Sequence, residues 1–151
     1  MFSLFASPEF ASRPSGSDTS ENWLTSIDGQ GKRILVIDDE YLIRHLMTDV
    51  LSSVNFRVVT APDGEEGMRL YREAPESWDL VILDMVMPVM NGEEVFRQII
   101  TQNPSQRVLI CSGYNDRYEV DSMIQDGAIG LLAKPFNLRE LFTFLKKSTD
   151  I

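Results

Sequence analysis

The chain has 151 residues, with 23 acidic against 14 basic side chains and a formal net charge of −9. Its hydrophobic fraction of 43% and charged fraction of 25% are typical of a single soluble globular domain. The acidic balance, without a Lys/Arg cluster, argues against direct binding to nucleic acid and against contact with an anionic membrane surface. The single cysteine, Cys111, excludes an internal disulfide and fits a reducing compartment, so a cytoplasmic location is expected.

The first 31 residues differ from the rest of the chain, because they are rich in Ser and follow no helical or strand-like period. They lack the basic start and the apolar run of a signal peptide. We interpret 1–31 as an N-terminal extension, a linker or a tag remnant, and 32–151 as the globular domain. No apolar run in the chain approaches the roughly 18 residues of a membrane helix.

From Lys32 onward, apolar runs typical of buried strands alternate with segments whose apolar residues recur at helical spacing. The expected strands are 33–38, 56–61, 78–84, 106–112 and 128–134. The expected helices are 40–54, 62–74, 93–102, 115–127 and 137–147. Five alternations of strand and helix predict an α/β fold, a doubly wound parallel sheet of five strands with helices on both faces.

Polar side chains stand where these strands end, and in such sheets ligands bind outside the carboxyl ends of the strands. Four of the five strands contribute: the first ends in Asp38 and Asp39, the third in Asp84, the fourth in Ser112 followed by Gly113, and the fifth in Lys134 followed by Pro135. Three carboxylates, a hydroxyl and an ammonium are therefore expected at one rim of the sheet.

The stretch "ILVIDDE" (34–40) places three acids directly after a buried strand, although neighbouring carboxylates repel one another. A hard divalent cation resolves this, because Mg²⁺ prefers oxygen ligands and keeps several waters. We expect Asp39 and Asp84 to bind Mg²⁺ directly and Asp38 to act through water. A backbone carbonyl near Val86 is a further candidate ligand.

The remaining rim groups suit a phosphoryl group. Lys134 supplies positive charge, Ser112 a hydroxyl donor, and the Gly113 amide a donor with little steric hindrance. Asp84 is a plausible nucleophile, since carboxylates form aspartyl phosphates in covalent catalysis. The sequence therefore predicts a Mg²⁺-dependent site for phosphoryl transfer to Asp84.

Four motifs resemble those of the receiver domain of two-component response regulators: "VIDDE" (36–40), "LVILDMVMPVMNG" (80–92), "LICSGY" (109–114) and "AKPF" (133–136). The resemblance covers roughly Gly31 to Lys147. It implies a flavodoxin-like (βα)5 fold with strand order 2-1-3-4-5 and a cis Lys134–Pro135 bond. It also implies that Asp84 accepts a phosphoryl group from the phosphohistidine of a histidine kinase or histidine phosphotransfer protein.

By the same resemblance, Asp38 and Asp39 form the Mg²⁺ site, while Ser112 and Lys134 contact the phosphoryl group and relay its presence. The protein is then a switch in a phosphorelay that assists its own phosphorylation and dephosphorylation, not a turnover enzyme.

The expected switch region comprises Leu131, Tyr114 and Pro135, and the chain departs from the family pattern at Leu131. Many receivers carry Tyr or Phe where Leu131 stands, so the usual coupling of a hydroxyl to an aromatic ring is in question, and Tyr114 is a candidate substitute. The "SGY" motif resembles receivers attached to hybrid histidine kinases. Because the chain ends soon after the last expected helix, we expect output through an unknown downstream protein, with the domain a monomer or weak dimer.

Three alternative functions share features with this pattern. A haloacid-dehalogenase-type phosphatase also uses an aspartyl nucleophile, but it needs a second acid where Val86 stands. A flavodoxin-like cofactor carrier is disfavoured because Asp38, Asp39 and Glu40 would repel its phosphate. The third alternative, a degenerate receiver that serves as an interaction scaffold without phosphorylation, remains open.

Overall fold

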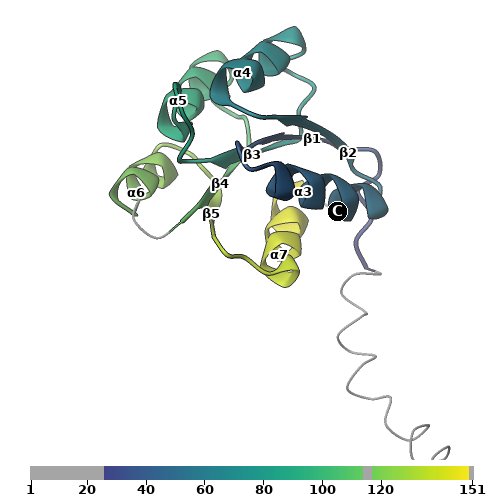
Figure 1. Cartoon of the computed structure of the whole chain (residues 1–151). Helices are drawn as coiled ribbons and strands as arrows, with labels where there is room; N and C mark the ends of the chain where they lie inside the picture. Colours follow the sequence, from purple (N-terminus) through teal and green to yellow (C-terminus); the bar gives the residue numbers. More distant parts are fainter. Residues whose placement is uncertain (1–25, 114–116, 150–151) are drawn as a thin grey trace, which may run out of the picture.

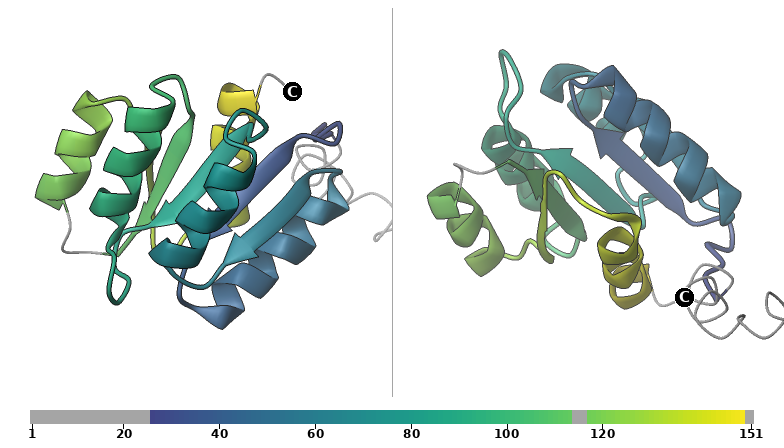
Figure 2. Two further views of the ribbon diagram at one scale, coloured as in Figure 1. Left: turned by 90° about the horizontal axis from the view of Figure 1, so that it is seen from above. Right: turned by 60° about the horizontal axis from the view of Figure 1, so that its bottom comes forward.

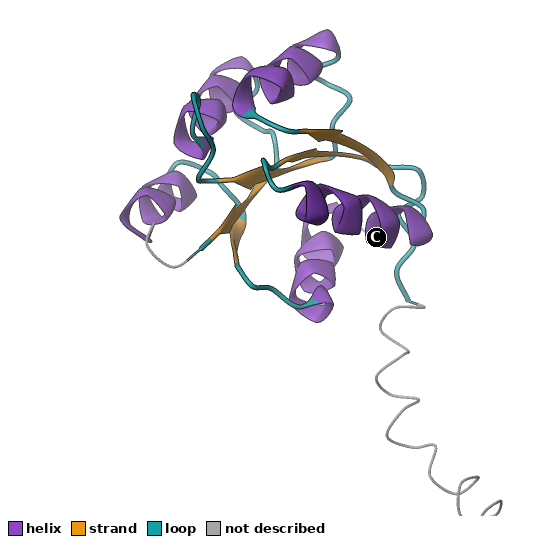
Figure 3. Cartoon of the chain, in the orientation of Figure 1, coloured by secondary structure: helices purple, strands orange, loops and turns teal. Residues whose placement is uncertain are grey.

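The computed structural model describes residues 26–113 and 117–149. The strands are β1 (Arg33–Ile37), β2 (Arg57–Ala61), β3 (Leu80–Asp84), β4 (Val108–Ser112) and β5 (Gly130–Ala133). The helices are α3 (Tyr41–Ser53), α4 (Gly64–Glu73), α5 (Gly92–Gln102), α6 (Arg117–Gln125) and α7 (Leu138–Thr149). Strand and helix alternate along the described part of the chain, as predicted (Figures 1 and 3).

The five strands form one parallel sheet in the order β2-β1-β3-β4-β5. This confirms the predicted doubly wound architecture and the strand order 2-1-3-4-5. Figure 2 shows helices on both faces of the sheet. Within the described residues, no helix combines the length and the apolar character needed to cross a membrane.

Successive strand residues point to opposite faces, which divides the core into two layers. In β1, Leu35 and Ile37 pack with the buried residues of α4, α5 and α6, whereas Ile34 and Val36 pack with those of α3 and α7. The central strands β1, β3 and β4 are buried on both faces, and this explains why they read as continuous apolar runs in the sequence. Cys111 is buried in β4, as expected for a small apolar side chain.

Two helices, α4 and α5, begin one or two residues from the predicted start, at positions that side-chain caps determine. Helix α4 begins at Gly64, not at residue 62, because the Asp63 carboxylate accepts a hydrogen bond from the Glu66 amide. Helix α5 begins at Gly92, one residue early, because the Asn91 side chain accepts from the Glu94 amide at 3.0 Å. Both starts bring the chain close to the rim where the candidate site lies.

The described residues before Lys32 contact the domain. Ile27 is buried, and the Gly29 amide donates to the Val54 carbonyl at 2.6 Å, beside the turn between α3 and β2. A Cβ atom on Gly29 would lie 2.6 Å from Cγ of Phe56, so this position requires glycine's small size. The division of the chain at residue 31 stays a prediction, and the expectations for residues 1–25 lie outside the described residues.

Candidate functional site

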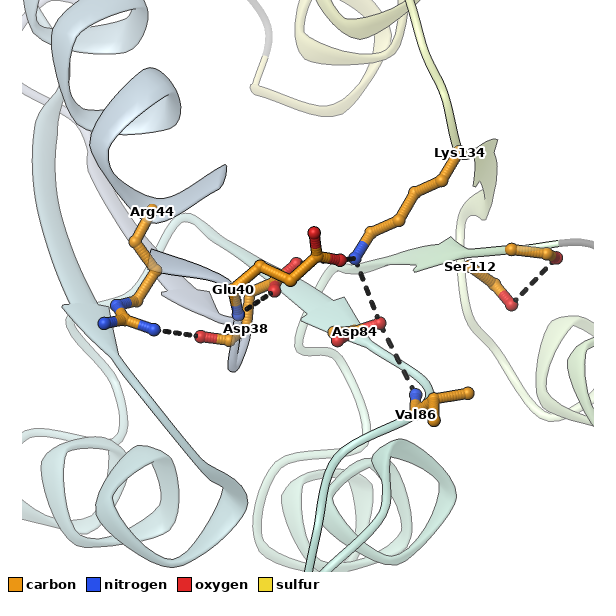
Figure 4. Close-up of polar contacts among 8 residues, drawn as sticks. Asp38, Glu40, Arg44, Asp84, Val86, Ser112 and Lys134 are labelled. Atoms are coloured by element: carbon orange, nitrogen blue, oxygen red, sulfur yellow. Dashed lines mark hydrogen bonds and ion pairs between the residues drawn. The ribbon is translucent and has the colours of Figure 1, made fainter. Parts of the chain in front are cut away.

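The carboxyl ends of β1, β3, β4 and β5 meet at one rim because the sheet is parallel. Asp38 follows the last residue of β1, Asp84 is the last residue of β3, and Ser112 the last of β4. The register pairs Ile37 with Leu83, which places Asp38 beside Asp84. The Lys134 amide donates to the Ser112 carbonyl at 2.7 Å and so fixes the start of the Lys134 side chain next to β4. Figure 4 shows Asp38, Glu40 and Asp84 close to the ammonium of Lys134, with Ser112 to one side.

Lys134 connects the acidic side chains of the rim. Its Nζ lies 3.0 Å from Asp38 Oδ2, 2.9 Å from Glu40 Oε1 and 3.4 Å from Asp84 Oδ1 (Figure 4). Burial opposes the charge of Lys134, but the hydrogen bonds to Glu40 and Asp38 and the charges of Asp84 and Asp38 together outweigh it and hold the pKa of Lys134 above its usual value. Lys134 therefore favours its charged form among these carboxylates.

Asp84 lies deep in the rim, with 4% of its surface exposed. Its burial, together with the neighbouring charge of Asp38, raises the pKa of Asp84 to about 7, although the Lys134 ammonium acts in the opposite direction. A bound cation would favour the ionised form, because positive charge stabilises a carboxylate. The site therefore has unbalanced negative charge that a metal ion would neutralise.

The carboxylates of Asp38, Asp39 and Asp84 offer oxygen atoms that all lie within 4.8 Å of one another. Opposite ligands of an octahedral Mg²⁺ ion lie about 4.2 Å apart, given bonds of about 2.1 Å. Small side-chain movements would thus bring these oxygens to Mg²⁺ distances, and the all-oxygen donor set suits this ion. The acidic cluster that the sequence predicted is assembled and fits a hard divalent cation.

A tight loop between β3 and α5 packs closely against the backbone of Asp84 and Met85. The Gly92 amide donates to the Met85 carbonyl at 2.9 Å. A Cβ atom on Gly92 would lie 2.3 Å from the Asp84 carbonyl oxygen and 2.7 Å from Met85 Cα. Within this loop Val89 adopts a φ of 70°, a left-handed conformation that β-branched residues rarely take. The position of Asp84 therefore depends on the absence of a side chain at residue 92.

The predicted roles of Val86, Ser112 and Gly113 stay predictions. Val86 is 64% exposed, and its amide donates to Asp84 Oδ1 at 3.4 Å. The Ser112 hydroxyl donates to the Gly113 carbonyl at 3.3 Å (Figure 4). Ser112 thus lies at the rim, as the last residue of β4. The space around the Gly113 Cα is open, as expected for a residue that leaves its amide accessible.

The predicted switch residues are placed only in part. Leu131 lies in β5, partly buried against the core layer formed with α4, α5 and α6. The Lys134–Pro135 bond is cis, which confirms the expectation from the resemblance, and Pro135 is exposed. Tyr114 lies outside the described residues.

Two residues at the rim were not predicted from the sequence. Glu40 shares Lys134 with Asp38, and the Arg44 guanidinium donates to the Asp38 carbonyl at 2.8 Å (Figure 4). The signal for Glu40 was present, since it is the third acid of "ILVIDDE", but Arg44 reads as an ordinary helix-surface residue. The Arg44 hydrogen bond connects α3 to the end of β1, and the Glu40 side chain extends from the same segment to Lys134.

Known proteins are similar to this chain in sequence and in fold. The family model of the response regulator receiver domain matches residues 34–146. The chain is 30% identical over 118 residues to the chemotaxis protein CheY of Thermotoga maritima, a match covering 78% of this chain and 97% of that protein. A response regulator receiver domain protein from Clostridium thermocellum has a similar structure, with a TM-score of 0.76 and 32% identity over 79% of this chain and 94% of that chain.

A second solved structure, the complex of CheX, CheY, BeF₃ and Mg²⁺ from Borrelia burgdorferi, gives a TM-score of 0.72 at 26% identity. That match covers 77% of this chain and 87% of that one. The family model alone spans most of the described domain, including every strand whose end contributes to the rim. The chain therefore belongs to the response regulator receiver domains of two-component signalling.

Proposed function

We propose that this receiver domain accepts a phosphoryl group on Asp84 in a Mg²⁺-dependent reaction. The observation that carries the proposal is the position of Asp84, buried at the end of β3 between Asp38 and Lys134. The donor is the phosphohistidine of a histidine kinase or histidine phosphotransfer protein, in the cytoplasm. The Borrelia burgdorferi complex supports the role of the metal, because it holds a receiver relative with BeF₃ and Mg²⁺.

In the proposed reaction, one carboxylate oxygen of Asp84 attacks the phosphorus atom. The phosphorus–nitrogen bond of the donor breaks, its electron pair returns to the imidazole nitrogen, and an acyl phosphate remains on Asp84. Lys134 stabilises the charge on the phosphoryl oxygens, and Ser112 and the Gly113 amide donate hydrogen bonds to them. Asp38, Asp39, Asp84 and the Val86 carbonyl would hold Mg²⁺, which would neutralise the charge of the phosphoryl group and of the carboxylates.

The acyl phosphate then acts as a signal. The negatively charged phosphoryl group on Asp84 attracts the Ser112 hydroxyl and the Lys134 ammonium, which lie beside the end of β5. This attraction shifts the population of conformations of α6 and β5 toward a state that a downstream protein binds. With Leu131 in place of an aromatic residue, this shift proceeds without a rotating ring in β5. Hydrolysis of the acyl phosphate ends the signal, so the protein is a switch.

Removal of the metal tests this proposal. We expect the wild-type protein to gain one phosphoryl group from acetyl phosphate in the presence of Mg²⁺ and none in the presence of a chelator. Intact-mass spectrometry measures the adduct directly, and returning excess Mg²⁺ to the chelated sample is the control that should restore it. Equal adduct with and without metal would contradict the proposed mechanism. No adduct despite Mg²⁺ binding, with a phosphohistidine donor as well, would favour the scaffold alternative.

Replacing Val86 should change how long the signal lasts. The branched Val86 side chain is exposed two residues after Asp84, where it can shield the acyl phosphate from attacking water. We expect the phosphorylated Val86→Asn protein to lose its phosphoryl group several times faster than the wild type, because an amide side chain can hold and orient a water molecule. The loss of adduct with time after removal of acetyl phosphate measures this rate. Equal decay of the two proteins would refute the shielding role.

A further inference from the structure

Glu40 occupies the N-cap position of α3, yet its side chain does not cap the helix. The Glu40 carboxylate accepts no hydrogen bond from the free amides of the first turn. Glu is a poor capping residue compared with Ser, Thr, Asp or Asn. Its side chain instead extends across the rim, where Oε1 accepts a hydrogen bond from Lys134 Nζ at 2.9 Å (Figure 4). The contact with Lys134 is therefore the interaction that this side chain makes.

The distances around Lys134 show how its charge is shared. Glu40 and Asp38 lie at 2.9 and 3.0 Å from Nζ, whereas Asp84 lies at 3.4 Å. The ammonium thus lies closer to two other carboxylates than to the proposed phosphoacceptor. Because Asp38 is buried and fixed by the hydrogen bond from the Glu40 amide at 2.8 Å, Glu40 is the partner most easily released.

The exposure of the two side chains determines how firm this contact is. The Lys134 side chain is 16% exposed and that of Glu40 is 58% exposed, so water screens the pair from one side. An ion pair with one well-exposed partner contributes little stability and separates at little cost. Such an ion pair can hold Lys134 in one position before the reaction. It can then break when a more highly charged anion binds Lys134.

We propose that Glu40 is a positioning residue that holds Lys134 back from the phosphoryl-binding position until the phosphoryl group arrives. This inference rests on the proposed phosphorylation of Asp84. No covalent bond changes at Glu40, and Lys134 keeps its proton throughout. The ammonium exchanges a carboxylate oxygen of Glu40 for an oxygen of the phosphoryl group, which carries more negative charge. Before that exchange, Glu40 competes with an incoming donor for Lys134 and so slows the uptake of phosphoryl groups from small molecules.

Two substitutions of Glu40 separate this contact from a general effect of charge. Glu40→Gln removes the charge and keeps the length of the side chain. Glu40→Asp keeps the charge but is one methylene shorter, so its carboxylate no longer reaches Lys134. If the contact restrains Lys134, both variants take up phosphoryl groups about two- to fivefold faster than the wild type at subsaturating acetyl phosphate and fixed Mg²⁺, the range that an exposed ion pair supports. If only the field of the charge matters, Glu40→Asp behaves like the wild type.

Glu76→Gln serves as the matched control, because it makes the same change in net charge as Glu40→Gln. Glu76 lies in the exposed turn before β3, at the amino-terminal ends of the strands and so away from the rim. We expect its uptake rate to equal that of the wild type. The decay of the adduct provides a second readout. In the phosphorylated state Lys134 has already left Glu40, so both Glu40 variants should lose their phosphoryl group at the wild-type rate. Thermal unfolding of each variant records any change in the stability of α3.

The outcomes distinguish the failure of this inference from the failure of the proposed function. Faster uptake by both Glu40 variants, with unchanged decay and an unchanged control, supports the positioning role. Acceleration of Glu40→Gln alone, no acceleration of either variant, or an equal change in uptake and decay overturns it while the wild-type adduct stands. No adduct on any of the four proteins contradicts the phosphorylation of Asp84 and removes the role of Glu40 with it.

Discussion

The Asp84→Asn protein will gain no phosphoryl group from acetyl phosphate under conditions that fully modify the wild type. The amide that replaces the carboxylate is not a nucleophile toward phosphorus, so the loss should be complete and not partial. The nearby acids Asp38 and Asp39 do not substitute for Asp84, because their expected role is to hold the metal. Intact-mass spectrometry after matched incubations measures the adduct on both proteins.

Asp49→Asn is the appropriate control for this experiment. It removes one carboxylate from the exposed surface of α3, where Asp49 contacts only His45 among the ion pairs of the described residues, at 3.3 Å. We expect this variant to be modified as fully as the wild type. An adduct on Asp84→Asn equal to that on the wild type would show that another side chain is the acceptor.

Replacement of Gly92 by Ala will destabilise the protein and distort the site together. The added Cβ would lie 2.3 Å from the Asp84 carbonyl oxygen and 2.7 Å from Met85 Cα, and both are backbone atoms that move only with β3. Ala favours the helical conformation of residue 92 by about 1 kcal/mol over Gly, but the clash outweighs this gain. We expect a net loss of roughly 2 kcal/mol in the free energy of unfolding.

The same substitution should weaken Mg²⁺ binding by about tenfold, because a shift of Asp84 of even a few tenths of an ångström disturbs an octahedral site. Urea denaturation measures the stability, and calorimetric titration with Mg²⁺ measures the affinity. Gly113→Ala is a matched control for stability, since a Cβ there meets nothing within 4 Å. A Gly92→Ala protein with wild-type stability and Mg²⁺ affinity would show that the loop adapts and that Gly92 does not determine the position of Asp84.

Much of the fold could be predicted from the sequence because its three central strands are buried on both faces. Runs such as "RILVI" and "LVILD" are continuous and apolar, and five of them alternate with helical patterns. The exact ends of the elements were less predictable. Pro62 suggested the start of α4, but the capping hydrogen bond of Asp63 determines it. A cap depends on the local backbone conformation, which composition and period do not report.

The candidate site was predictable to the extent that it follows from topology. Asp38, Asp84 and Lys134 meet because parallel strands bring their carboxyl ends to one rim, and this requires only the strand assignments. The closer contact of the Lys134 ammonium with Glu40 than with Asp84 was not predictable, because it depends on side-chain conformations and on differences of a few tenths of an ångström.

Gly67 in α4 is another feature that the sequence alone did not explain. It reads as a weak point in a helix, but it allows α4 to approach Ile37 closely, since a Cβ atom on Gly67 would lie only 2.6 Å from Ile37 Cδ1.

Chemical trapping of the acyl phosphate tests the central claim most directly. Borohydride reduces an aspartyl phosphate to homoserine, so the modified position can be read by peptide mass spectrometry after incubation with Mg²⁺ and acetyl phosphate. The account predicts homoserine at position 84 of the wild-type protein, and none when Mg²⁺ is chelated. Homoserine at position 38 or 39, or a phosphoryl adduct that borohydride does not convert, would contradict the assignment of Asp84 as the phosphoacceptor.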